Sequence, residues 1–200
     1  VLTGHPLRVL ESGRHSDIDI LFSCTTHEVD WYVINDPRFD PGSIKNIVDV
    51  FALKGRIPRS RARRIVDAYD VNGRTPAEVR GALYTDYSFT LPAVRAALAH
   101  AAAGGKAHLL SVGPVEGAPA VHGTEMYGIV GQERPQQSDE QAVRDTFVRD
   151  ALLDFAAGSH DRLWNAVTTE PTSHGIGKPP YDPTAHAAEV LCTFAGIERT

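Results

Sequence analysis

Two short apolar segments, separated by a long helical stretch, constrain the fold more than any other feature of this sequence. Residues 18–24 (IDILFSC) and 107–112 (AHLLSV) are each too short for a helix. Short apolar runs of this kind are typical of strands buried in a parallel sheet. Parallel neighbours need a long crossover connection, which the stretch between them supplies. The pattern therefore predicts part of an α/β sheet flanked by helices.

The helices of this connection are predicted from their capping residues. Ser43 is placed to cap a helix over 43–54, whose apolar residues share one face. Thr75 precedes Pro76, which suits the first position of a helix because proline has no N–H to leave unsatisfied. Glu78 lies three residues after Thr75, so the two predict a capping box. These signals therefore predict a helix that starts after Thr75.

Further helices are predicted at about 60–69, over 89–103 and over 139–157. A Gly-Gly pair ends the 89–103 helix, and a single glycine ends the 139–157 helix. The long last helix is expected to bury one apolar stripe, formed by Val143, Phe147, Ala151 and Phe155.

The C-terminal part of the chain is less regular. Residues 168–183 are rich in proline and glycine and predict an irregular segment, with a last strand at 189–194. No linker or repeat divides residues 1–200. We therefore expect residues 1–200 to belong to a single domain.

Composition excludes several classes of protein. The 20 basic and 25 acidic residues give a net charge of −5, which argues against a nucleic-acid partner. The hydrophobic fraction of 42% excludes a disordered chain. No run approaches the ~20 apolar residues of a membrane span, so no membrane partner is expected. Two cysteines suggest buried thiols and a reducing, cytoplasmic compartment.

Two charge patterns have ordinary explanations. The five arginines of one basic cluster are expected to form a solvated helix face: Arg56, Arg59, Arg61, Arg63 and Arg64. The His27-Glu28 pair lacks the second histidine of H-E-x-x-H, and no Cys/His quartet has zinc spacing. We expect no metal.

The candidate site consists of Glu28 and His122, which follow the first and second predicted strands. Sites in open α/β sheets gather outside the carboxyl ends of the strands. An acid and a histidine there fit the acid–base half of a hydrolase triad. Asp30 is the alternative acid, although a capping role is equally open to it. Cys24 ends an apolar strand and is expected to be an inert core thiol.

Five stretches of the sequence resemble, in order, motifs of the type-B carboxylesterases. Residues 5–33, HPLRVLESGRHSDIDILFSCTTHEVDWYV, resemble the segment that carries the family's triad glutamate. Residues 85–112, TDYSFTLPAVRAALAHAAAGGKAHLLSV, are similar to the helix and strand that precede the triad histidine. Residues 117–131, GAPAVHGTEMYGIVG, resemble the pattern GA.HG.ELPYVFG. Residues 147–164 and 178–194 are similar to the penultimate helix and the terminal WPPYDP..R.TMVF run.

This resemblance implies an α/β-hydrolase fold, of which the chain is the C-terminal part, and carboxylic-ester hydrolysis without a cofactor. Glu28 falls at the family's triad glutamate, although His27 replaces the usual Asp and Val29 the usual Gly. His122 falls at the triad histidine. The aromatic residues Trp31, Tyr32 and Phe39 either pack in the core or line an acyl pocket.

The nucleophile of such an enzyme lies in a G-x-S-x-G elbow, and residues 1–200 contain no such motif. Neither Ser43 nor Ser159 has the flanking glycines. We therefore expect the chain to be inactive alone. Its partners are expected to be a small-molecule ester and the missing N-terminal half of the same enzyme. The alternative is an inactive remnant, or a non-enzymatic interaction module of the same fold.

Overall fold

A three-stranded parallel sheet lies at the centre of the protein. The computed structural model describes residues 4–31, 40–71, 73–159 and 163–197. Strands β1 (Ile20–Thr25), β2 (Ala107–Val112) and β3 (Ser173–Ile176) are arranged in the order β1-β2-β3. In the register, Ile20 pairs with Ala107 and Leu109 pairs with Ser173. The strands predicted at 18–24 and 107–112 are therefore confirmed, and β2 has its predicted bounds.

Helices make up most of the rest of the described chain. Their bounds are α1 Pro6–Glu11, α3 Ile44–Gly55, α4 Arg59–Tyr69, α5 Pro76–Thr85, the π-helical turn η2 Asp86–Thr90, α6 Leu91–Ala102, α7 Met126–Val130, α8 Asp139–Ala156 and α9 Pro183–Thr193. The helix predicted over 89–103 is continuous with the one that starts after Thr75, because η2 joins α5 directly to α6.

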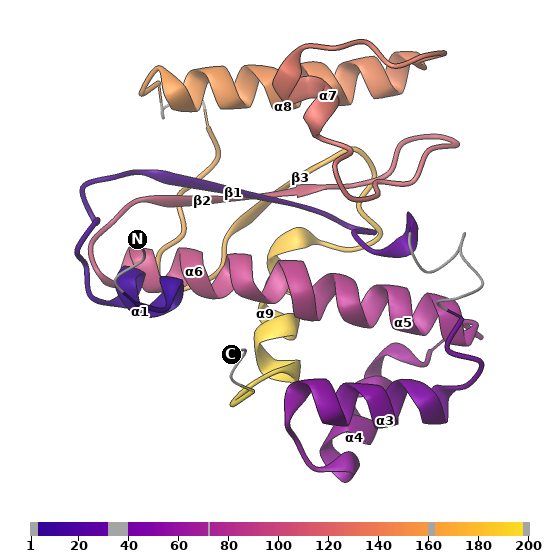
Figure 1. Ribbon diagram of the computed structural model, residues 1–200. Helices are drawn as coiled ribbons and strands as arrows, with labels where there is room; N and C mark the ends of the chain where they lie inside the picture. The colour runs from indigo at the N-terminus through magenta and orange to yellow at the C-terminus, as the bar shows by residue number, and fades with distance from the viewer. Residues whose placement is uncertain (1–3, 32–39, 72, 160–162, 198–200) are drawn as a thin grey trace.

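Helices cover both faces of the sheet, with α7 and α8 on one side and α6 and α9 on the other (Figure 1). The side chains of β2 alternate between these layers, as a strand requires. Leu109 packs with Val94 of α6 and Ala187 of α9. Leu110 and Val112 pack instead with Val148 of α8. A strand buried on both faces explains why its sequence is almost continuously apolar.

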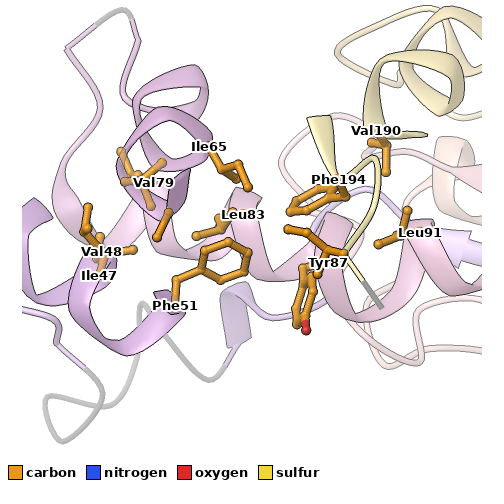
Figure 2. Close-up of a cluster of buried hydrophobic side chains, with 13 residues drawn as sticks. Ile47, Val48, Phe51, Ile65, Val79, Leu83, Tyr87, Leu91, Val190 and Phe194 are labelled. Atoms are coloured by element: carbon orange, nitrogen blue, oxygen red, sulfur yellow. The ribbon is translucent and has the colours of Figure 1, made fainter. Parts of the chain in front are cut away.

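A second and larger core lies between α3, α4, α5 and the end of α9, as Figure 2 shows. Phe51 is at its centre, and its ring meets that of Tyr87 edge-on with the centroids 5.1 Å apart. Phe194 packs against both rings, with centroids 6.1 Å from Phe51 and 5.7 Å from Tyr87. This core attaches the helical excursion to the layer formed by α6 and α9.

The predicted caps are confirmed. Ser43 accepts a hydrogen bond from the Asn46 N–H at 3.3 Å at the start of α3. Thr75 and Glu78 form the reciprocal capping box of α5. These signals are local, so they determine where a helix begins whatever its tertiary surroundings.

The buried face of α8 differs from the predicted stripe. Val143, which was expected to be buried, is 69% exposed. The buried residues of the helix are Arg144, Asp145, Val148 and Ala151. The apolar periodicity was misleading because two charged residues turn inward, where they are paired with each other. Buried charges are tolerated when they are paired in this way.

The C-terminal part of the chain is more regular than predicted. A strand, β3, lies within the segment expected to be irregular. The strand expected at 189–194 is instead the end of helix α9. The capping signal was present, since Asp182 accepts a hydrogen bond from the Ala185 N–H and Pro183 occupies the first turn. Apolar and β-branched residues near the end of the helix favour a strand locally. The cap and the packing of α9 against α6 favour the helix instead, and the helix is what forms.

Candidate active site

The candidate site lies where β1 and β2 end. The parallel pairing of these strands continues past their ends, since Thr26 donates its N–H to the Val112 carbonyl at 3.0 Å. His27 then forms a parallel bridge with Val121 and donates its N–H to the Ala120 carbonyl at 3.1 Å. The next residue along each chain segment is a predicted site residue. Backbone hydrogen bonds thus place the two segments side by side, independently of any contact between side chains.

Glu28 and His122 are in direct contact. The Glu28 Oε2 and His122 Nδ1 atoms are 2.7 Å apart, and the Glu28 side chain is 3% exposed. The other oxygen, Oε1, accepts the backbone N–H of Thr25 at 2.7 Å. A carboxylate only accepts hydrogen bonds, so Nδ1 carries the hydrogen and Nε2 presents its lone pair. Both carboxylate oxygens are fixed, and they fix the imidazole tautomer in turn.

The His122 imidazole is accessible on its far side. Its side chain is 53% exposed, in contrast to the buried acid that it contacts. One face of the ring meets Phe89, with the centroids 5.3 Å apart. Phe89 lies in η2, and π-helical turns of this kind are frequent at functional sites. In the sequence, only its place in the TDYSF motif distinguishes Phe89 as a residue near the candidate site.

Glu125 is a third titratable group near this pair. Burial raises the pKa of its carboxyl, and the negative charge of Glu28 raises it further, whereas His122 and Arg144 lower it. Within the described residues, its Oε2 atom is buried without a hydrogen-bond partner. No sequence pattern predicts a role for Glu125, because its distance from Glu28 is set only by the fold.

The alternative acid, Asp30, faces a different element. A Cβ atom added to Gly81 of α5 would come within 2.5 Å of the Asp30 Oδ1 atom. Burial raises the pKa of Asp30, and Glu78 raises it while His27 and Arg74 lower it. Among the residues described, the carboxylate in contact with His122 is therefore that of Glu28.

The remaining predicted features are placed as follows. Burial raises the pKa of the Cys24 thiol, and Glu28 raises it further, which fits an unreactive thiol. Trp31 is 62% exposed, and Tyr32 and Phe39 lie outside the described residues. Ser43 is used as a helix cap.

The arginine cluster lies on the surface of the protein. Arg59 pairs with Asp49 and Arg63 with Asp67 on the exposed surface, as expected of a solvated helix face. In the described ranges, no three His, Cys, Asp or Glu side chains gather closely enough to hold a metal ion. The helices of the same ranges include none with the length and apolar character of a membrane span.

A parallel sheet between two helical layers is the architecture of an α/β fold, and here an acid and a histidine follow neighbouring strands. Among solved structures, the crystal structure of the Geobacillus stearothermophilus carboxylesterase EST55 at pH 6.2 is similar, with a TM-score of 0.75. The two sequences are 20% identical, and the match covers 95% of this chain and 43% of that esterase. The chain thus spans less than half of its structural relative.

This similarity confirms the fold that the sequence motifs implied, a part of an α/β-hydrolase like that of a carboxylesterase. The sequence matches no protein-family model, and no curated protein is detectably similar to it. Chemistry must therefore be argued from the residues of the site.

Proposed function

We propose that this chain supplies the acid and the base of a Ser-Glu-His triad that hydrolyses carboxylic esters. The observation that carries the proposal is the 2.7 Å contact between Glu28 Oε2 and His122 Nδ1 at the ends of adjacent parallel strands. The buried carboxylate orients the ring and stabilises the imidazolium as it forms. The exposed side of His122 faces outward, where a nucleophile and an ester can approach it.

The reaction proceeds through an acyl-enzyme. Nε2 of His122 takes the proton of a serine hydroxyl while the serine oxygen attacks the ester carbonyl carbon. The tetrahedral intermediate then releases the alcohol, which receives the proton from the imidazolium. Water, deprotonated by the same histidine, then attacks the acyl-serine carbonyl carbon. The bond to the serine oxygen breaks, the serine takes the proton back from the imidazolium, and the carboxylic acid is released.

The serine and the oxyanion donors are proposed to come from a segment outside these 200 residues, because no G-x-S-x-G motif occurs within them. Strand β1 supports this arrangement. It is an edge strand of the sheet, and its outer side is free of any strand within the described residues. An edge of this kind can pair with a further strand.

The test uses the polypeptide in which this chain is joined to a G-x-S-x-G segment, with 4-nitrophenyl ester turnover as the measurement. His122→Ala should lower kcat by several orders of magnitude, on the order of 10⁴ or more as for other triads. The wild-type activity should rise with pH, because only the neutral imidazole can accept the serine proton.

The matched control is His15→Ala, since His15 is exposed and belongs to another part of the chain. His100 and His108 are unsuitable controls because both are buried, and His100 Nε2 is bonded to the Ile18 carbonyl. Full activity in His122→Ala would refute the triad. Turnover by the 200 residues alone would show that a nucleophile lies within them. If neither these residues nor the joined polypeptide turns over the ester, the result favours the non-catalytic module.

A further inference from the structure

The loop that carries His122 has little regular structure of its own. It runs from the end of β2 to α7, and residues 113–125 contain only isolated bridges and turns. A short turn surrounds the histidine, in which Thr124 donates its N–H to the Val121 carbonyl at 2.9 Å. The position of the imidazole therefore depends on what holds the two ends of this loop.

A single group of charged side chains from α8 and from the connection between α7 and α8 holds both ends. At the start of the loop, Arg144 Nη1 of α8 lies 3.5 Å from the Gly113 carbonyl, to which it donates. At the other end, the Arg134 guanidinium donates to the carbonyl of Thr124, two residues after His122. One end of the loop is thus held by α8 and the other by the segment that precedes α8, on the side of the sheet where α7 and α8 lie (Figure 1).

Asp145 of α8 fixes Arg134 in turn. Arg134 Nε donates to Asp145 Oδ2 at 2.8 Å, and Nη2 donates to Oδ1 at 3.3 Å. Gln137 Nε2 donates to Oδ2 at 3.0 Å, and Arg144 Nε lies 3.4 Å from Oδ1. The Arg134 Cζ atom also lies 3.9 Å from the centre of the Tyr127 ring. Because the guanidinium is planar and donates in a fixed fork, these contacts hold Arg134 in one orientation.

The Arg134–Asp145 pair is largely buried, unlike the Arg149–Asp150 pair of α8. The side chains of Arg134 and Asp145 are 15% and 7% exposed, whereas Arg149 and Asp150 are 46% and 59% exposed. Exposed pairs contribute little to structure, but a buried, fully hydrogen-bonded pair can specify one arrangement of the chain. The fit is tight, since a Cβ atom on Gly128 of α7 would collide with the Asp145 backbone oxygen.

We infer that Asp145 and Arg134 are positioning residues for the His122 imidazole: they hold the Thr124 carbonyl, and so keep Nδ1 of His122 on Glu28. Neither residue touches the reacting atoms. The catalytic consequence rests on the proposed function, but the hydrogen bond itself can be measured without turnover.

The first measurement is made on the 200-residue chain labelled with ¹⁵N-histidine. Nuclear magnetic resonance (NMR) reports the Nδ1-bound proton and the tautomer of His122. Asp145→Asn removes the charge at almost constant volume, and Arg134→Lys keeps the charge but loses the fork. Both should lower the population of the Nδ1–H tautomer and weaken the downfield proton signal. Asp150→Asn, five residues further along the same helix, should change neither.

The second measurement is ester turnover in the polypeptide that includes the serine segment. A misplacement of about 1 Å can cost on the order of a hundred-fold in rate, so we expect kcat to fall about ten- to a hundred-fold in both variants with KM little changed. The pH midpoint of kcat should also move, which a loss of stability alone would not cause. If Asp145→Asn does not fold, the result for Arg134→Lys decides whether the positioning role holds.

The outcomes separate the two proposals. Unchanged His122 signals in the folded variants would overturn the positioning role, whatever the turnover. Changed signals with no turnover in any protein, including the wild type, would support the positioning role and reject the esterase. A uniform loss of thermal stability with unchanged tautomer and pH midpoint would reduce the pair to a structural role and overturn the inference.

Discussion

Asp86 and His186 lie 100 positions apart in the chain, yet Asp86 Oδ1 accepts a hydrogen bond from His186 Nε2 at 2.8 Å. The second oxygen, Oδ2, accepts the hydroxyl of Tyr69 at 2.8 Å. Tyr181 stacks on the His186 ring, with the centroids 3.8 Å apart. One buried acid in the π-helical turn therefore connects α4, η2 and α9, which belong to both cores of the protein.

Removing the Tyr69 hydroxyl should destabilise the protein measurably. A hydrogen bond to a charged group contributes about 1.5–3 kcal/mol, so Tyr69→Phe should lower the free energy of unfolding by about that amount in urea denaturation. The matched control is Tyr84→Phe, because the buried Tyr84 hydroxyl has no hydrogen-bond partner among the described residues. Tyr84→Phe should be neutral or slightly stabilising. Equal losses in both variants would contradict this account of Asp86.

The choice of acid can be tested by amide substitution in the polypeptide that includes the serine segment. Glu28→Gln should keep the fold and lower kcat by about 10⁴-fold, as the equivalent Asp→Asn change does in a serine protease. The amide cannot hold the imidazole in the required tautomer. Asp30→Asn should be nearly silent, since the Asp30 carboxylate lies against α5. If Asp30→Asn is the damaging substitution, the assignment of Glu28 is wrong.

The two cysteines should differ sharply in reactivity toward Ellman's reagent. Cys192 is exposed, whereas burial raises the pKa of Cys24 and so suppresses its thiolate. The native chain should therefore release one thiol equivalent rapidly and the second only in denaturant. Cys192→Ser should remove the fast phase and Cys24→Ser should not. A fast reaction of Cys24 would contradict its assignment as an unreactive core thiol.

Stability should fall at mildly acid pH because of His174. Its ring is stacked between Phe147 and Trp164, with centroid distances of 5.4 and 5.0 Å. Burial lowers the pKa of His174 below its ordinary value near ~6.5. The unfolded chain then binds more protons than the folded one as the pH falls below that value. The contribution of the neutral ring to stability is complete above about pH 6.5 and is lost as the pH falls through the folded pKa.

Urea midpoints at intervals from pH 8 to pH 5 would measure this effect. His174→Phe should flatten the pH dependence, because the stack is retained and the titrating group is gone. The control His15→Gln should follow the wild-type curve, since His15 is exposed. An unchanged slope in His174→Phe would show that another group accounts for the loss.

The sequence by itself determined the elements with local signals. Ser43 and the Thr75–Glu78 capping box marked helix starts, and the apolar run of β2 was placed with its observed bounds. The order of strand, helical excursion and strand predicted the parallel sheet. Such features depend on hydrogen bonds and side chains within a few residues, so sequence is sufficient to predict them.

Tertiary structure decided where local signals were weak or misleading. Helix α9 replaced an expected strand, and α8 buries Arg144 and Asp145 rather than Val143. A charged residue can turn inward only where a partner of opposite charge and backbone carbonyls meet it. Arg144 and Asp145 are neighbours in sequence, but Arg134 and the Gly113 carbonyl lie outside the helix, where periodicity does not describe them.

The candidate site divides in the same way. The rule that sites gather at the carboxyl ends of parallel strands placed Glu28 and His122 at one edge of the sheet from sequence alone. Only the tertiary structure decided that the Glu28 carboxylate contacts the imidazole while that of Asp30 lies against α5. Two residues along a turn point in different directions, and the pairing of His27 with Val121 sets which one faces the histidine.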